Sequence, residues 1–135
     1  MNPPQPQPQA EARTVNKPQA PAEETWSETL ARVGRMRREY QARRDIVSRM
    51  VAGVENLELV EPEGSFYAFI RYGGDVPSVD VVARALEQGV AVRSGSEFGP
   101  SGEGHVRIAF STGRERLIEG MERLLGILEE VAAPA

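Results

Sequence analysis

The chain has 135 residues, a formal net charge of −4, one histidine and no cysteine. This length allows one domain, and no stretch approaches the roughly 20 apolar residues that a membrane-spanning helix needs. Without cysteine or a second histidine the chain has no disulfide, thiolate nucleophile or multi-histidine metal site of its own, and its acidic balance argues against a general nucleic-acid binder.

Residues 1–24 are expected to form a disordered leader. The first 22 residues hold six of the ten prolines and four of the six glutamines, so burial cannot offset the entropy of ordering them. They contain neither the basic region nor the apolar run of a secretory signal, and we expect a soluble cytoplasmic protein. Lys17, the only lysine, lies here, where no fixed, desolvated pocket is available to activate its amine.

A long helix is predicted from residue 26 to residue 52. Thr25 and Glu28 have the spacing of a capping box, and Gly53 is placed to end the helix as its C′ residue. At 1.5 Å per residue the helix is roughly 40 Å long, whereas a compact domain of this size is only about 33 Å across. We therefore expect its first half to project or to pack on something else. The apolar stripe on that half consists of Trp26, Leu30, Val33 and Met36.

The same helix is basic, with seven arginines against three acidic residues between positions 27 and 52. A basic helix can bind nucleic acid. The more ordinary interpretation is a solvated face that also pairs with the acidic remainder of the chain, and we adopt it. No nucleic-acid partner and no membrane partner is expected.

Two strands and a short helix are expected next. Residues 57–60 alternate between apolar and polar, residues 65–70 are aromatic and β-prone, and a Pro-Glu-Gly turn separates them. Ser78 is placed to cap a helix that Gly89 ends. The predicted apolar stripe of this helix consists of Val79, Val82, Ala83 and Leu86.

The rest of the chain predicts two more strands and a helix. Residues 90–93 and 105–110 have strand patterns, and the loop between them, residues 94–104, holds four glycines. Thr112 and Glu115 have the spacing of a second capping box. The element order is αββαββα, an α+β fold with three helices against a small, mainly antiparallel sheet. The last helix is expected to bury Leu117, Ile118, Met121, Leu124, Leu125 and Leu128.

Arg107 is the polar residue that stands out. Alternation along residues 105–110 puts it on one strand face with His105 and Ala109, opposite the larger apolar residues. One interpretation is an arginine on the solvent side of a sheet. The other is a fixed guanidinium that binds a carboxylate through two hydrogen bonds, beside a glycine-rich loop that lets a ligand approach. The sequence shows no Ser/His/Asp set, carboxylate pair or Walker pattern.

Four motifs occur in order: Y-Q-A-R-R-D at 40–45, P-E-G-S-F-Y-A-F at 62–69, V-A-V-R-S-G-S-E-F-G at 90–99 and G-H-V-R-I-A-F-S at 104–111. Together they resemble the C-terminal small domain of class I/II aminotransferases, the pyridoxal-phosphate enzymes of fold type I. The resemblance covers residues 40 to about 128, and four motifs with matching spacing are far more specific than one.

The resemblance implies roles for individual residues. By it, Arg107 pairs with the α-carboxylate of an amino acid or 2-oxo acid, and Phe66 and Ser96 lie at the edge of the same site. Ser94 departs from the family, which often has proline there. Pyridoxal 5′-phosphate is the cofactor by family resemblance only. The Schiff-base lysine, the aspartate facing the pyridine nitrogen and the phosphate-binding residues belong to a large domain that this sequence does not contain, so no catalytic, cofactor-binding or metal-binding residue is assigned.

Three hypotheses follow from this resemblance. The first is a truncated aminotransferase, with residues 25–135 as its small domain, that is inactive alone. The second is a split enzyme, in which a separately encoded large domain supplies the lysine and cofactor and docks on the long helix. A gene remnant or a misplaced start is the alternative to it. The resemblance also allows a homodimer partner to cover that helix. The third is a non-catalytic ligand-sensing or interaction module like those fused to winged-helix regulators. This hypothesis needs an upstream DNA-binding module, and the Pro/Gln-rich leader does not provide one.

Overall fold

The computed structural model describes residues 1–6 and 22–134. Most of the predicted leader, including Lys17, lies outside the described residues. From residue 26 onward the element order is the predicted αββαββα, with two short 3-10 turns before the last strand. The α+β fold class is therefore confirmed.

The three helices are α1 (Trp26–Ala52), α2 (Ser78–Glu87) and α3 (Arg114–Val131), and the four strands are β1 (Glu58–Val60), β2 (Tyr67–Arg71), β3 (Arg93–Ser94) and β4 (His105–Ala109). The 3-10 turns η1 (Gly95–Phe98) and η2 (Pro100–Gly102) connect β3 to β4. The strands form one antiparallel sheet in the order β1-β2-β4-β3, so β4 is an inner strand. None of the helices in the described part of the chain is long and apolar enough to cross a membrane.

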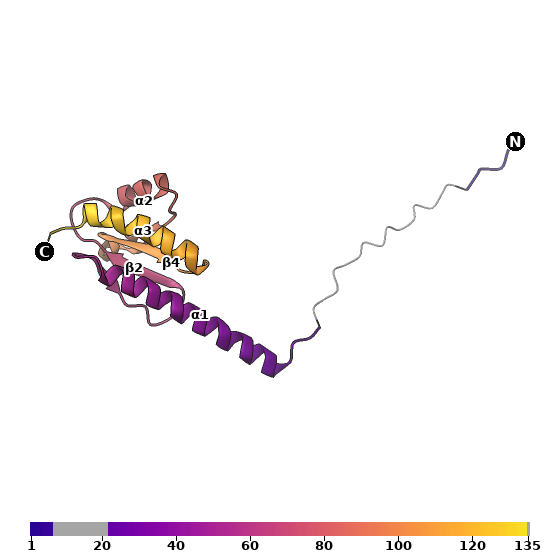
Figure 1. Cartoon of the computed structure of the whole chain (residues 1–135). Coiled ribbons are helices and arrows are strands. Elements are labelled where there is room, and N and C mark those ends of the chain that lie inside the picture. The colour runs from indigo at the N-terminus through magenta and orange to yellow at the C-terminus, as the bar shows by residue number, and fades with distance from the viewer. Residues whose placement is uncertain (7–21, 135) are drawn as a thin grey trace.

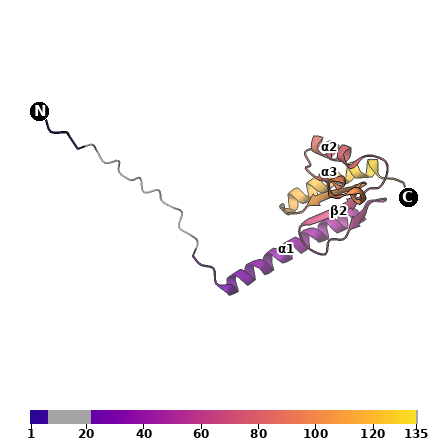
Figure 2. The ribbon, with the colours of Figure 1, turned by 180° about the vertical axis from the view of Figure 1, so that it is seen from behind.

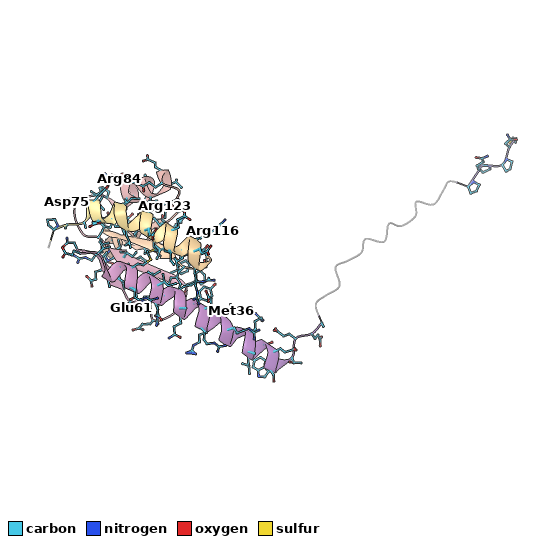
Figure 3. The ribbon with its side chains drawn as sticks, in the orientation of Figure 1. Met36, Glu61, Asp75, Arg84, Arg116 and Arg123 are labelled. Atoms are coloured by element: carbon cyan, nitrogen blue, oxygen red, sulfur yellow. The ribbon has the colours of Figure 1, made fainter. Side chains whose placement is uncertain are left out.

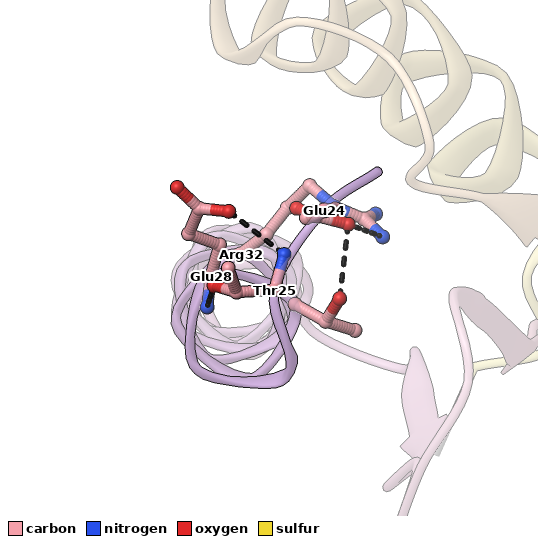
Figure 4. A network of polar contacts seen from close by, with 5 residues as sticks. Glu24, Thr25, Glu28 and Arg32 are labelled. Carbon is pink, nitrogen blue, oxygen red and sulfur yellow. Dashed lines mark hydrogen bonds and ion pairs between the residues drawn. The ribbon is translucent and has the colours of Figure 1, made fainter. Parts of the chain in front are cut away.

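The start of α1 is fixed by the predicted capping box (Figure 4). Thr25 Oγ1 accepts a hydrogen bond from the Glu28 N–H at 3.2 Å, and the Glu28 carboxylate accepts one from the Thr25 N–H at 2.8 Å. Glu24 adds an ion pair with Arg32, at 3.1 Å. Gly53 follows the helix as its C-cap, in a right-handed rather than a left-handed conformation. The helix start is thus stabilised by its own side chains.

The core lies between the sheet and helices α1 and α3, which pack against each other on one of its faces (Figures 1 and 2). Ala68 and Ile70 of β2 and Val106 and Ile108 of β4 are buried on that face, as strand alternation requires. α2 packs against α3 and β3. The helices contribute the buried apolar side chains of Val47, Val51, Val81, Ala85, Leu117, Met121, Leu124, Leu125, Ile127, Leu128 and Val131.

The first half of α1 extends beyond the sheet (Figure 1), as predicted. The side chains of Trp26, Leu30, Val33 and Met36 are 75, 54, 51 and 48% exposed, and Figure 3 shows Met36 on this part of the helix. The buried residues of α1 lie in its last two turns. The apolar stripe of the first half is therefore uncovered within the described part of the chain.

The predicted burial of α2 is wrong. Val79 and Leu86 are 57 and 64% exposed, whereas Ser78, Val81 and Ala85 are buried. Both sets have helical spacing, so the sequence pattern does not choose between them. In the fold, Val81 and Ala85 join the hydrophobic core, and the Ser78 hydroxyl on the same face is hydrogen-bonded to Ser94 and Glu103. Ser78 is also the first helical residue and not the predicted N-cap.

All four strands are shorter than predicted, and β1 and β4 each lack one end residue of the predicted range. β2 begins at Tyr67 rather than at residue 65, because Ser65 has a φ of 65°, which is incompatible with an extended strand. β3 consists of Arg93–Ser94 instead of residues 90–93. The Val90 N–H donates to the Ala85 carbonyl at 2.9 Å, which ties this segment to the end of α2 instead of to the sheet.

The second predicted capping box is absent. α3 begins at Arg114 with Gly113 as its N-cap and no side-chain hydrogen bond to the cap, because Thr112 lies one residue too early. The start of α3 is instead linked to α1, since the Arg114 guanidinium donates to the Glu39 carboxylate at 3.0 and 2.7 Å. The burial predicted for Ile118 is also wrong, because that residue is 38% exposed, while the other five predicted residues of this helix are buried.

Candidate functional site

The face of the sheet opposite the core carries Arg107. The strand register places it between Phe69 of β2 and Arg93 of β3, with Val60 of β1 beyond Phe69. Because side chains alternate along a strand, these four residues form one row across the sheet, on the side away from α1 and α3. The burial pattern along β4 confirms the predicted alternation.

Two aromatic rings contact the guanidinium of Arg107. Its Cζ lies 4.1 Å from the ring centroid of Tyr67 and 4.5 Å from that of Phe98. Phe98, on η1, packs edge-on against Phe69, with the ring centroids 5.4 Å apart. Cation–π contacts of this kind restrict the orientation of a guanidinium without using its N–H donors. The donors are therefore left for another partner.

The Nε of Arg107 is buried and has no hydrogen-bond acceptor within the described residues. No carboxylate of that part of the chain forms an ion pair with this guanidinium. A buried donor without an acceptor is costly, so such a group favours a ligand that supplies one. An open groove of about 300 Å³ lies beside it, with walls that include Tyr67, Val82, Leu86 and Val92. A planar fork of N–H donors at such a groove can bind a carboxylate through two parallel hydrogen bonds.

Phe66, the second predicted site residue, lines a different hollow. Its ring stacks on Tyr40 of α1, with centroids 5.8 Å apart, and it borders a space of about 390 Å³ together with Arg37. Its link to Arg107 is indirect and runs through Tyr67, whose ring centroid lies 4.5 Å from that of Phe66.

Ser96, the third predicted site residue, lies on η1. Its hydroxyl is hydrogen-bonded to the hydroxyl of Ser94, and its N–H donates to Ser78 Oγ at 3.4 Å. These contacts place Ser96 in a cluster of serine hydroxyls, while Phe98 is the residue of η1 that contacts Arg107. The glycine-rich loop was thus expected at the site, but the residue through which it acts was not.

Tyr67 and Phe98 were missed as site residues by sequence reasoning. A partial signal was available for Tyr67, because it lies two positions before Phe69 and so shares a strand face with it. Which β4 residue that face adjoins depends on the register between β2 and β4, which the sequence pattern does not reveal. For Phe98, the position of its ring depends on how two glycine-containing turns fold against each other.

The two turns pack backbone against backbone. A Cβ added at Gly95 would collide with the carbonyl oxygens of Gly102 and His105, and one added at Gly102 would collide with the carbonyl oxygen of Gly95. Only glycine fits at both positions. This close approach helps to set where η1, and with it Phe98, lies over the sheet.

The chain is similar in sequence to curated aminotransferases. It is 36% identical over 110 residues to the aspartate aminotransferase of Pyrococcus horikoshii, which covers 80% of this chain and 27% of that protein. It is 39% identical over 100 residues to aromatic-amino-acid aminotransferase 2 of Thermococcus litoralis, over 73% of this chain and 25% of the relative. No family model matches the chain.

Solved structures agree with the sequence comparison. The aromatic aminotransferase of Pyrococcus horikoshii superposes with a TM-score of 0.68 at 39% identity, over 79% of this chain and 29% of that one. The chain is an aminotransferase small-domain homologue. The aspartate aminotransferase of Thermus thermophilus with maleate also superposes on this small-domain homologue, with a TM-score of 0.67 at 31% identity, over 75% of this chain and 26% of that one. The homologue spans only about a quarter of the length of the curated relatives that it matches.

Proposed function

We propose that this small-domain homologue supplies the arginine that binds the substrate carboxylate in a pyridoxal-phosphate-dependent aminotransferase. The observation that carries the proposal is the buried, unpaired Nε of Arg107 beside an open groove. The reaction moves an amino group between an amino acid and a 2-oxo acid, and both substrates carry a carboxylate next to the reacting carbon. A guanidinium that binds this carboxylate fixes where the reacting carbon lies.

Each group of the proposed site has a separate part. Two N–H groups of the Arg107 guanidinium donate parallel hydrogen bonds to the two carboxylate oxygens. Tyr67 and Phe98 restrict the guanidinium before binding, so less entropy is lost when the carboxylate arrives. Val82 and Leu86 form an apolar wall of the groove, which reduces the screening of the ion pair by water.

Pyridoxal phosphate supplies the electron sink in this class of reaction. The described residues do not fit that cofactor by themselves, because they include no lysine and Lys17 lies outside them. We assign no step of the cofactor's chemistry to this chain. The proposal places the Schiff-base lysine and the phosphate-binding groups in a region that corresponds to the other three quarters of the relatives' length. That region belongs either to the same polypeptide or to a partner. A cytoplasmic location is part of this proposal.

Carboxylate binding can be tested on the chain itself. Titration with maleate, followed by NMR at the backbone amides of β4, should give saturable shifts. Arg107→Met should weaken binding by about tenfold or more, because it removes two charge-assisted hydrogen bonds. Arg84→Met, at an exposed position on α2 (Figure 3), is the matched control and should bind like the wild type. Equal affinities for the wild type and Arg107→Met would overturn the assignment.

The proposed dependence on another cofactor-binding domain has its own test. The purified chain is mixed with pyridoxal phosphate, reduced with borohydride and mapped by mass spectrometry. No stoichiometric adduct at one defined site is expected, since a reactive lysine needs a fixed, desolvated pocket. One fully labelled lysine would show that the chain carries its own cofactor amine.

The uncovered stripe of α1 favours a split enzyme as a second candidate function. A separately encoded large domain would cover Trp26, Leu30, Val33 and Met36, which are all about half exposed or more. A tagged chain should then recover a pyridoxal-phosphate-binding protein from a lysate, and the complex should show transaminase activity. A Leu30→Glu variant should lose that protein. If the wild type and Leu30→Glu recover the pyridoxal-phosphate-binding protein equally, or if neither recovers it, docking at the stripe is contradicted.

A further inference from the structure

A row of three serine hydroxyls, of Ser78, Ser94 and Ser96, lies next to Phe98, and the first two of these serines are buried. Ser78, at the start of α2, and Ser94, at the end of β3, are 0 and 2% exposed. Their Oγ atoms are 2.8 Å apart, and the Ser94 hydroxyl is also hydrogen-bonded to that of Ser96. Buried polar groups are costly unless they are hydrogen-bonded. The Ser78 hydroxyl, at the buried end of the row, therefore needs a hydrogen-bond acceptor outside it.

That acceptor is the carboxylate of Glu103. The Ser78 N–H donates to Oε1 at 2.7 Å, and the Ser78 hydroxyl donates to Oε2 at 2.9 Å. These hydrogen bonds, the N–H one first, hold the pKa of Glu103 below its usual value and keep the carboxylate ionised at neutral pH. The carboxylate also acts as the cap that α2 otherwise lacks, because its N-cap residue Pro77 forms no side-chain cap hydrogen bond.

The ionised carboxylate sets the direction of the whole row. A carboxylate only accepts, so the Ser78 hydroxyl donates to Glu103, the Ser94 hydroxyl donates to Ser78, and the Ser96 hydroxyl donates to Ser94. The N–H of Ser96 lies 3.4 Å from the same Ser78 oxygen and also donates to it. One orientation of the three hydroxyls satisfies every bond, and the row ties η1 to the start of α2 and to the segment before β4.

Phe98 is attached to this row through η1, which also contains Ser96. The Phe98 side chain is 45% exposed, and its ring contacts are with Phe69 and with the guanidinium of Arg107. A ring so exposed is weakly held by burial alone. Its place beside Arg107 therefore depends on how firmly the backbone of η1 is held.

We infer that Ser78, Ser94 and Glu103 are positioning residues for Arg107: through η1 they hold Phe98 against its guanidinium. The inference rests on the proposed function of Arg107 as the carboxylate-binding group. If the hydroxyl row is broken, η1 loosens and the guanidinium rotates more freely. Binding of a carboxylate then costs the entropy of ordering the guanidinium, so the affinity of the chain for the carboxylate falls.

Ser94→Ala removes the central hydroxyl with a minimal change of volume, and Ser101→Ala, at an exposed serine of the same loop, is the matched control. In NMR of the full chain, rotation about the Cζ–Nε bond of Arg107 should become about fivefold faster in Ser94→Ala, the factor that corresponds to one ordinary hydrogen bond. The ring-current shift of the Arg107 Hε should shrink with it. Ser101→Ala should match the wild type. Unchanged rotation and an unchanged shift in folded Ser94→Ala would overturn the inference.

Variants at Glu103 and Phe98 test whether the change in Arg107 rotation passes through these two residues. Glu103→Gln keeps the shape of the side chain but replaces one acceptor oxygen by a donor, so it should speed the rotation as Ser94→Ala does. Phe98→Leu should also speed it, and the double variant Phe98→Leu/Ser94→Ala should rotate no faster than Phe98→Leu alone. Fully additive effects would contradict a path through Phe98.

Maleate affinity separates this inference from the proposed function. If Arg107 binds the carboxylate and the hydroxyl row positions it, Ser94→Ala should bind maleate about fivefold more weakly than Ser101→Ala. If the wild-type chain does not bind maleate, the proposed function fails, and the rotation rates alone decide whether the row positions Arg107.

Discussion

Three arginines of the outer sheet face differ in what they pair with. Arg71 lies 3.6 Å from a Glu58 carboxylate oxygen and Arg93 lies 2.8 Å from one of Glu97, whereas Arg107 forms no ion pair within the described residues. Exposed ion pairs contribute little to stability and are screened by salt. A buried Nε without an acceptor keeps its full hydrogen-bonding capacity for a ligand. The burial of Nε and the missing partner, more than the charge itself, support the proposed binding role of Arg107.

Two glycines provide a prediction at the residue scale. Gly95→Ala should lower the free energy of unfolding by about 1–3 kcal/mol, because the added methyl group meets the carbonyl oxygens of Gly102 and His105. Gly126→Ala, with open space around it in the middle of α3, should raise that free energy by about 0.5–1 kcal/mol. Urea denaturation measures both changes. Equal stability of the two variants would show that the two turns of the loop are not in close contact.

The helices differ in how their ends are held. The N-terminus of α1 is capped by Thr25 and Glu28, which adjoin it in sequence. The N-terminus of α2 is capped by Glu103, which lies 25 residues away from its partner Ser78. Local capping allows α1 to begin far from the sheet, whereas α2 and the loop before β4 depend on each other.

Hydrogen exchange should divide α1 into two parts. Amides of residues 25–37 should exchange rapidly, because the apolar stripe that includes Trp26 and Leu30 is uncovered within the described part of the chain. Amides from Val47 through Phe110 should be protected wherever they are hydrogen-bonded, since that region includes buried core residues. Uniformly strong protection along all of α1 in a proven monomer would contradict the view that its first half needs a partner.

The contact between α1 and α3 should make stability depend on pH. Hydrogen bonds from Arg114, assisted by Arg43, lower the pKa of Glu39 from 4.5 to about 2. A lowered folded-state pKa stabilises the fold above the unfolded value, and this contribution is lost as the pH falls from about 4.5 to about 2. Glu39→Gln should therefore lower the Tm at pH 7, and the difference from the wild type should vanish near pH 2.

The matched control for this pH dependence is Glu129→Gln, at an exposed position on α3. Introduced into both the wild type and Glu39→Gln, Glu129→Gln should leave the Tm difference between those two proteins unchanged at each pH. A Glu39→Gln effect of the same size at pH 7 and pH 2 would show that the carboxylate charge is not what links the two helices.

In the whole molecule the core and the proposed carboxylate site lie on different faces of one sheet. The core lies between the sheet and helices α1 and α3, while the Arg107 groove opens on the opposite face. The first half of α1 contributes to neither, since its apolar residues are exposed. This division predicts that the domain folds without the projecting turns of its first helix.

Deletion of residues 1–30 tests that division. The deletion removes the capping box and the Glu24–Arg32 ion pair but no residue of the core. The Tm should change by no more than about 4 °C, and maleate affinity should be the same as in the full chain. Loss of cooperative unfolding would show that the projecting half of α1 is needed for the fold.

Sequence alone determined the features that depend on near neighbours. The αββαββα order follows from local periodicity, and the start of α1 follows from the Thr25–Glu28 spacing. The alternation along residues 105–110 places Arg107 on the strand face opposite the core. The resemblance to aminotransferases likewise depends on the order of short motifs. Each periodic pattern and each single motif is contained within a few residues, and their order along the chain needs no tertiary contact to be recognised.

Only the tertiary structure decided the features that depend on residues far apart in the chain. Two stripes on α2 have equal helical spacing, and the one that is buried packs Val81 and Ala85 in the core and places Ser78 where it hydrogen-bonds Glu103. The register of β2 against β4 brings Tyr67 to Arg107, and the packing of the two glycine-containing turns brings Phe98 to it. The physical reason is that these contacts gain their energy from long-range packing and hydrogen bonding, for which local sequence patterns carry no specific signal.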